Sequence, residues 1–123
     1  MIEAGRGGRV IGINTECAMQ CFPTQSAYVA AKRGMDGVLR CLAREVGSHG
    51  ITVNQVAPGW MVSDRERASG NERRPDYEAS VPMRRRGSDA DIANAVAFLA
   101  SDLAAFISGV YLPVCGGHVM PAI

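Results

Sequence analysis

Three short apolar runs that contain β-branched residues alternate with helical patterns, and this alternation constrains the fold more than any other feature. The runs cover residues 8–15, 51–57 and 109–114. A long helical pattern at 25–48 joins the first two, and a capping box beginning at Ser88 predicts a helix of about three turns before the third. Strands joined by helices run parallel through right-handed crossovers. The sequence therefore predicts an α/β fold, a parallel sheet of about three strands with flanking helices, with ligands at the carboxyl ends of the strands.

The stretch at 60–87 is polar and charged, and it is longer than the usual connection between elements. We interpret it as a functional lid with one or two helical turns, whose 60–80 part shapes a ligand pocket. The charged residues at 64–67 are interpreted mainly as solvated surface of that lid. Pro113 lies inside the third apolar run and favours an edge strand, because an edge tolerates a missing N–H.

The helix predicted at 25–48 has three distinct faces when its residues are placed at 100° intervals. The face predicted to pack on the sheet consists of Tyr28, Ala31, Met35, Val38, Leu39, Leu42 and Val46. The solvent face carries the charged residues Arg33, Asp36, Arg40 and Arg44. A third stripe holds only small residues, namely Ala27, Ala30, Gly34, Gly37 and Cys41. Each glycine inside a helix costs ~1 kcal/mol relative to alanine. A close helix–helix contact would offset that cost, so the stripe predicts a partner helix across a symmetric dimer; the alternative is that it only tolerates a nearby loop.

Charge and hydropathy exclude several classes of protein. The 123 residues carry 13 basic and 12 acidic side chains, whereas a nucleic-acid-binding protein usually shows a strong basic excess. No apolar run reaches the ~18 residues that span a bilayer. The first residues lack the apolar core of a signal peptide, so we expect a cytoplasmic protein without nucleic-acid or membrane partners.

The positions of several cysteines and one histidine offer a candidate metal site. Cys17, Cys21, Cys115 and His118 could supply four zinc ligands, but their spacing matches no zinc-ribbon or zinc-finger pattern. We interpret the cysteines as reduced thiols or small buried hydrophobes, and both histidines as surface or loop residues. No metal is expected.

Tyr28 and Lys32 lie four residues apart on the long helix, so their side chains are neighbours on one face. A free tyrosine titrates at pH ~10 and is a poor acid or base near neutrality. A neighbouring ammonium group favours the phenolate, and such a phenol can donate a proton to a carbonyl or remove one from an alcohol. The pair alone is weak evidence, because this spacing also arises by chance on helix surfaces.

Together with its surroundings, the pair resembles the C-terminal half of a classical short-chain dehydrogenase/reductase, the group that contains ketoacyl reductases and sugar or polyol dehydrogenases. The segments that carry the resemblance, in family order and spacing, are GRVI at 8–11, YVAAK at 28–32, LARE at 42–45, GITVN at 50–54, VAPG at 56–59, IANAVAFLASD at 92–102 and SG at 108–109. The resemblance implies a Rossmann-like parallel sheet and an oxidoreductase that uses NAD or NADP. It also implies a small-molecule carbonyl or alcohol as substrate.

The resemblance assigns the catalytic roles residue by residue. Tyr28 would be the acid/base, and Lys32 would stabilise the tyrosinate and hydrogen-bond the nicotinamide ribose. Thr15 stands 13 residues before the tyrosine, where the family usually has serine. Its hydroxyl can donate the same hydrogen bond to the substrate oxygen, although its methyl group crowds the pocket.

The resemblance also assigns residues to the cofactor. Pro58, Gly59 and the following backbone would meet the nicotinamide, and Ser63 occupies a position where a threonine often contacts the carboxamide. Cys115 replaces the asparagine or aspartate that the family has before its final glycine pair, which puts that polar contact in doubt.

The family's Gly-rich dinucleotide fingerprint follows no strand of this chain, since the glycines at 5–8 precede the first strand. We therefore expect residues 1–123 to form a single partial Rossmann-like domain that holds the catalytic and substrate half. The first strand would then present an unpaired edge, which predicts a homo-oligomer.

Two alternatives to the oxidoreductase stay open at this point. A hydrolase (esterase) could use the hydroxyl of Thr15 as nucleophile with Tyr28 and Lys32 as base, without any dinucleotide. A non-catalytic remnant could use the small-residue helix face and the last strand for assembly.

Overall fold

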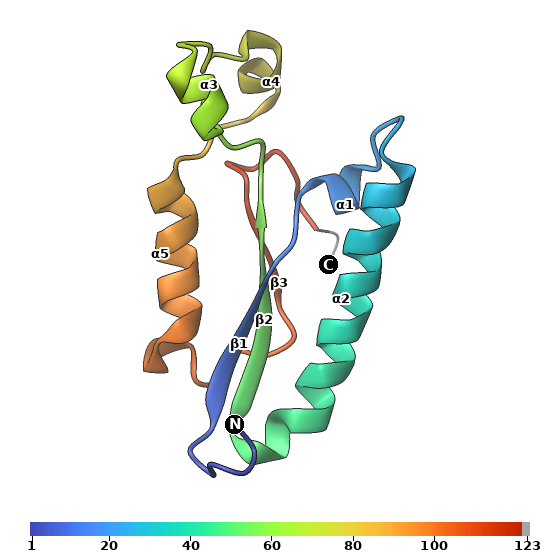
Figure 1. Cartoon of the computed structure of the whole chain (residues 1–123), viewed down its shortest axis with the longest axis vertical. Helices are drawn as coiled ribbons and strands as arrows, with labels where there is room; N and C mark the ends of the chain where they lie inside the picture. The colour runs from blue at the N-terminus through green and yellow to red at the C-terminus, as the bar shows by residue number, and fades with distance from the viewer. Residues whose placement is uncertain (122–123) are drawn as a thin grey trace.

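The computed structural model describes residues 1–121, which form a parallel three-stranded sheet. Strand β1 (Gly8–Ile13) pairs with β2 (Ile51–Pro58), and β2 pairs with β3 (Tyr111–Val114). The strand order is β1-β2-β3 (Figure 1). The predicted α/β class and parallel sheet are confirmed.

Two long helices cover opposite faces of the sheet (Figure 1). Helix α2 (Ser26–Val46) leads into a 3-10 turn at Gly47–His49, and α5 (Asp89–Ala100) is followed by a second one at Asp102–Ala104. The capping box predicted at Ser88 is present: Asp91 N donates to Ser88 Oγ over 3.3 Å and Ser88 N donates to Asp91 Oδ2 over 2.7 Å. No helix within residues 1–121 is long and apolar enough to cross a bilayer.

Three short helices gather at the carboxyl end of the sheet (Figure 1). Helix α1 (Cys17–Gln20) directly follows β1, in a segment where the sequence indicated only irregular structure. Helices α3 (Asp64–Ala68) and α4 (Pro75–Ser80) lie within the predicted lid at 60–87. The one or two helical turns expected in the lid are therefore two separate short helices.

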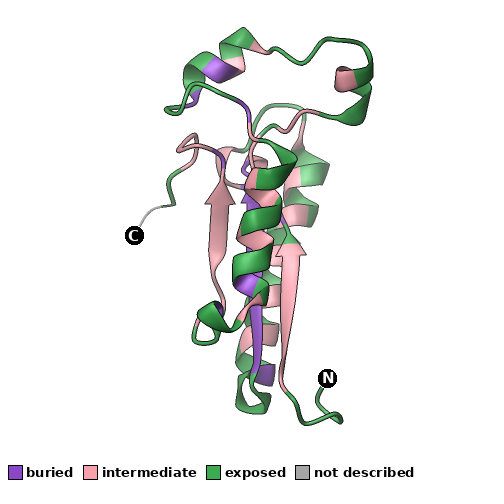
Figure 2. Ribbon diagram, turned by 90° about the vertical axis from the view of Figure 1, so that its left-hand side faces the viewer, coloured by how far each residue is buried: buried purple, intermediate pink, exposed green. Residues whose placement is uncertain are grey.

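Strand β2 is the centre of the hydrophobic core, and residues 51–57 are all buried (Figure 2). On the α2 side, the buried residues Val46, Ile51 and Val53 pack with Val10, Leu39, Leu42 and Ala43. On the α5 side, Val56, Leu99 and Ala104 form the second buried cluster. Pro113 of strand β3 pairs with Ala57 of β2. Strand β3 lies at one edge of the described sheet, as predicted.

The predicted faces of α2 are partly wrong. Val38 was expected on the sheet but is 67% exposed, while Asp36, expected in solvent, turns inward. The cause is Gln55 on β2, whose side chain is buried under the helix: its Nε2 donates to Asp36 Oδ1 over 2.8 Å. A buried amide requires a partner, and this requirement outweighs the apolar pattern of the helix.

The small-residue stripe of α2 is exposed along its whole length. This holds for Ala27, Ala30, Gly34, Gly37 and Cys41. Side-chain carbons built at Gly34 and Gly37 would meet nothing within 4 Å. The partner helix and the homo-oligomer stay predictions.

Candidate active site

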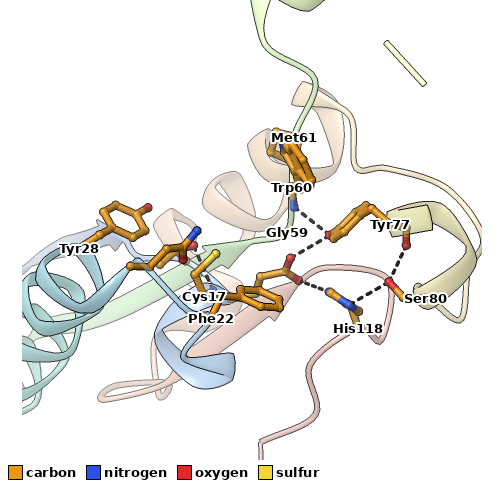
Figure 3. A pocket seen from close by; sticks show the side chains of 12 residues that line it. Cys17, Phe22, Tyr28, Gly59, Trp60, Met61, Tyr77, Ser80 and His118 are labelled. Atoms are coloured by element: carbon orange, nitrogen blue, oxygen red, sulfur yellow. Dashed lines mark hydrogen bonds and ion pairs between the residues drawn. The ribbon is translucent and has the colours of Figure 1, made fainter. Parts of the chain in front are cut away.

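A cavity of about 710 Å³ opens at the carboxyl ends of β1 and β2, where an α/β sheet is expected to bind its ligand (Figure 3). Its wall consists of Thr15, Glu16, Cys17, Phe22, Gln25, Tyr28, Gly59, Trp60, Met61, Tyr77, Ser80 and His118. The residues from 60 to 80 belong to the lid, so the structure agrees with the prediction that this segment shapes the pocket.

The three predicted catalytic residues lie at this site. Tyr28 sits in the first turn of α2, half exposed at the cavity, and Thr15 is buried in the loop after β1. Lys32 is one turn further along α2, with Nζ 6.0 Å from the centre of the Tyr28 ring. Its Nζ donates to the carbonyl oxygen of Ile13 over 2.8 Å, which fixes the ammonium group beside the end of β1.

The loop that carries Thr15 is held by hydrogen bonds from three elements. Asn14 Nδ2 donates to Lys32 O over 3.2 Å and to Gln55 Oε1 over 2.7 Å, while Asn14 Oδ1 accepts from Thr15 N over 2.9 Å. The hydroxyl of Tyr111 donates to the Thr15 carbonyl, and burial raises the pKa of Tyr111 to about 12. Asn14 thus connects the backbone of α2, the centre of β2 and the loop after β1.

Of the residues assigned to the cofactor, Pro58 ends β2, and Gly59 directly after it lines the cavity. A side chain at Gly59 would have no room, because its Cβ would lie 2.6 Å from Tyr77 Oη and 3.2 Å from Glu16 Oε2. Ser63 caps α3: its Oγ accepts from Glu66 N over 3.3 Å and donates to Glu66 Oε2 over 3.0 Å. Ser63 can therefore donate to a carboxamide only by exchanging its Glu66 partner, whereas its second lone pair stays open to accept from one.

A second group of polar side chains on the cavity wall was not predicted. We call Glu16, Tyr77, Ser80 and His118 the Glu16 cluster (Figure 3). Glu16 is only 2% exposed; its Oε1 accepts from Tyr77 Oη over 2.9 Å, and its Oε2 lies 3.1 Å from His118 Nδ1. His118 Nε2 is 3.0 Å from Ser80 Oγ.

Packing and further hydrogen bonds hold the Glu16 cluster in place. The Tyr77 ring meets the His118 ring edge-on at 4.9 Å, and Gln20 Nε2 donates to the backbone oxygen of His118 over 3.4 Å. Tyr77 Oη accepts from Trp60 N over 2.8 Å. Burial, together with the Glu16 carboxylate, raises the pKa of Tyr77 well above its usual range, so its hydroxyl stays a donor.

The prediction that His118 is a surface or loop residue holds for the loop, although the side chain is only 11% exposed. It lies after β3 and meets Glu16 across 102 positions of sequence, a contact that no local pattern indicates. Within residues 1–121 no group of three or more His, Cys, Asp or Glu side chains is arranged to hold a metal ion, and all four cysteines are free thiols.

Arg86 anchors the lid above the cavity and is itself 7% exposed. It donates to Trp60 O over 3.1 Å, to Glu72 O over 2.7 Å and to the Met61 carbonyl. It also pairs with Glu66, and this hydrogen-bonded guanidinium lowers the pKa of Glu66 to about 2. Glu66 is therefore part of a hydrogen-bonded network. The expectation for residues 64–67 was mainly solvated surface, which does not hold for Glu66.

These elements define a class: a parallel α/β sheet with a tyrosine and a lysine one turn apart on a helix, beside a hydroxyl after the preceding strand. Residues 1–118 match the family described as enoyl-(acyl carrier protein) reductase, so the chain belongs to this group of the short-chain dehydrogenases/reductases.

Individual relatives agree with this assignment. The chain is 49% identical over 115 residues to the 3-oxoacyl-[acyl-carrier-protein] reductase FabG of Escherichia coli, and 44% identical to that of Staphylococcus epidermidis. Both alignments cover 94% of this chain and 47% of the relative. The acetoin dehydrogenase YohF of Salmonella typhimurium superimposes with a TM-score of 0.82 at 38% identity, covering 95% of this chain and 45% of that one. The chain thus spans just under half the length of these relatives.

Proposed function

We propose that the chain carries the catalytic half of an NAD(P)-dependent oxidoreductase that interconverts a carbonyl and an alcohol, with Tyr28 as acid/base. The observation that carries the proposal is the cavity shared by Tyr28 and Thr15, with the ammonium group of Lys32 fixed one helical turn away.

Each residue has a separate task in the proposed reaction. Tyr28 donates its hydroxyl proton to the substrate oxygen during reduction and recovers it during oxidation, and Lys32 stabilises the tyrosinate in between. Thr15 Oγ1 accepts from Cys17 N over 3.2 Å and, within residues 1–121, donates to no other group. Its O–H is therefore available to hold the substrate oxygen in line with Tyr28.

The residues around the cavity suit a nicotinamide nucleotide, NAD or NADP, which when bound exchanges a hydride with the substrate carbon. Lys32 Nζ uses one of its three N–H groups on Ile13 and keeps two for a ribose. The backbone after Pro58 borders the same space at Gly59, and the second lone pair of Ser63 Oγ is open to accept from the carboxamide.

The names of the relatives support a small carbonyl or alcohol as substrate, because one group is named for 3-oxoacyl groups and the other for acetoin.

The hydrolase alternative gains little support. Thr15 Oγ1 already accepts from Cys17 N. Ser80, His118 and Glu16 have the order of a hydrolytic triad, but Ser80 Oγ donates to Tyr77 O over 2.6 Å and the next N–H, that of Val81, is bound to the same carbonyl. The Val81 N–H is therefore not free to act as an oxyanion donor beside the hydroxyl.

The test is cofactor binding and turnover in Tyr28→Phe. We expect the variant to bind the reduced cofactor, followed by its fluorescence, as tightly as the parent chain. We expect its turnover to fall by about 10²-fold or more, because the acid/base is lost. Undiminished turnover in the variant would refute the proposal. So would the lack of cofactor binding by the chain both alone and mixed with the N-terminal half of a FabG relative.

A further inference from the structure

One end of the cavity is polar, and the proposed chemistry does not use it. Tyr28 lies at one end of the cavity, while Tyr77, Ser80 and His118 of the Glu16 cluster lie at the other (Figure 3). Phe22 lies between the two ends. A substrate whose reacting carbon is at Tyr28 can therefore extend its other end toward Ser80 and His118.

The hydrogen bonds of the cluster leave an acceptor at this end. A carboxylate only accepts, so His118 Nδ1 must donate to Glu16. The single hydroxyl hydrogen of Ser80 lies within reach of two acceptors, Tyr77 O at 2.6 Å and His118 Nε2 at 3.0 Å. It can serve only one of them, and if Nε2 itself carries a hydrogen and donates to Ser80, a lone pair of Oγ stays open. Every arrangement leaves an acceptor lone pair in this group that a ligand O–H can fill.

A second open acceptor borders the same cavity. The side-chain oxygen of Gln25 is buried and has no hydrogen-bond partner among residues 1–121. A buried acceptor without a partner costs about 1–3 kcal/mol, so a ligand that donates to it would be favoured. Phe22, Trp60 and Met61 offer apolar walls to a carbon chain, whereas the Glu16 carboxylate disfavours an anionic group at this end.

We propose that Ser80 and His118, held in position by Glu16, bind a second hydroxyl group of the substrate. The substrate class is then a neutral hydroxyketone or polyol, with its reacting carbon at Tyr28 and a further O–H at the Glu16 cluster. The position of the reacting carbon rests on the proposed function, whereas the recognition of the hydroxyl does not.

The test is a binding titration of the full 123-residue chain without any nicotinamide nucleotide. Trp60 is the only tryptophan and lines the cavity, so its fluorescence reports occupancy. The ligands are matched pairs: ketones with a hydroxyl one, two or three carbons from the carbonyl, each beside the same ketone without the hydroxyl. The variants are Ser80→Ala and His118→Phe. The phenylalanine at position 118 keeps the aromatic contact with Tyr77. Gly34→Ala, on the exposed face of α2 outside the cavity wall, serves as the control, and circular dichroism verifies that each variant is folded.

We expect the parent chain and Gly34→Ala to bind the hydroxylated member of at least one pair about tenfold more tightly or better. Ser80→Ala and His118→Phe should reduce this ratio to about one. Equal affinity within every pair, or no binding of any pair by the folded chain, would overturn the proposal. A preference that persists in both cluster variants, or that disappears in Gly34→Ala, would also overturn it. Since no cofactor is present, the outcome does not depend on whether the chain turns over substrate.

Discussion

Gly59→Ala is predicted to weaken the attachment of the lid to the end of β2, mainly through one steric clash with Tyr77. The φ angle of Gly59 is not in the left-handed region, so alanine adds no backbone strain. Its Cβ would instead lie 2.6 Å from Tyr77 Oη, a distance that atoms do not sustain. The hydroxyl must move, and it then leaves both its donor, Trp60 N, and its acceptor, Glu16 Oε1.

The size of the effect follows from these two hydrogen bonds. A net hydrogen bond contributes ~1 kcal/mol and one to a charged group about 1.5–3 kcal/mol, so we expect a loss of about 2–4 kcal/mol in the free energy of unfolding. Tyr77→Phe removes the hydroxyl and the same two bonds, so alone it should cost a similar amount. In the double variant the clash with Tyr77 Oη is gone and only the milder contacts remain, at 3.1 Å with Cys115 Cβ and 3.2 Å with Glu16 Oε2. The combined loss should therefore stay close to that of one substitution.

Urea unfolding of the four chains gives the coupling energy as a double-mutant cycle. Gly34→Ala is the matched control: its Cβ would meet nothing within 4 Å inside a helix, so it should stabilise by about 0.5–1 kcal/mol. The reasoning is refuted if Gly59→Ala lies within about 0.5 kcal/mol of the parent chain, a surface-like effect. Strict additivity of the Gly59 and Tyr77 losses would refute it too.

Three further measurements examine other parts of the structure. Asp36→Ala leaves the buried amide of Gln55 without its acceptor and should cost about 1–3 kcal/mol in urea unfolding, whereas alanine at the exposed Asp64 should change little; equal losses would contradict the inward-facing Asp36. The folded pKa of Glu66 lies near 2, below its ordinary value of 4.5, so its stabilising effect is present above pH 4.5 and disappears as the pH falls toward 2. The urea midpoint should therefore drop over this window in the parent chain and less in Glu66→Gln, and parallel pH curves would contradict the assignment. Gly37→Leu on the exposed small-residue stripe should shift the mass measured by light scattering toward the monomer, while a parent chain that is already a monomer would contradict the predicted homo-oligomer.

The sequence predicted those parts of the site that depend on one element or on neighbouring elements. Tyr28 and Lys32 share a helix face, and Thr15 lies in the loop after the preceding strand. Helical periodicity and strand order therefore bring these three residues together. The inward turn of Asp36 could not be predicted, because it depends on a buried glutamine of β2 that periodicity treats as an ordinary strand residue.

The Glu16 cluster lay beyond sequence reasoning for a different physical reason. Its members come from the loop after β1, from the lid helix α4 and from the loop after β3, and only the tertiary fold brings these segments together. A buried carboxylate directly after Thr15 was the one available signal. A charged residue at the end of a buried strand requires a partner, so Glu16 by itself indicates a polar contact.

The position of β2 between two partners has a kinetic consequence. Its backbone amides are covered by both helices and bonded to neighbours on both sides, whereas β1 and β3 each pair on one side within the described sheet. Solvent deuterium should therefore reach most amides of residues 52–56 only when β2 separates from its neighbours, whereas the amide of Val53 is held by the hydroxyl of Ser108. The outward-facing amides of β1 and β3 exchange by small local fluctuations. The slowest-exchanging protons of the chain should trace a single strand, and that strand ends at the cavity.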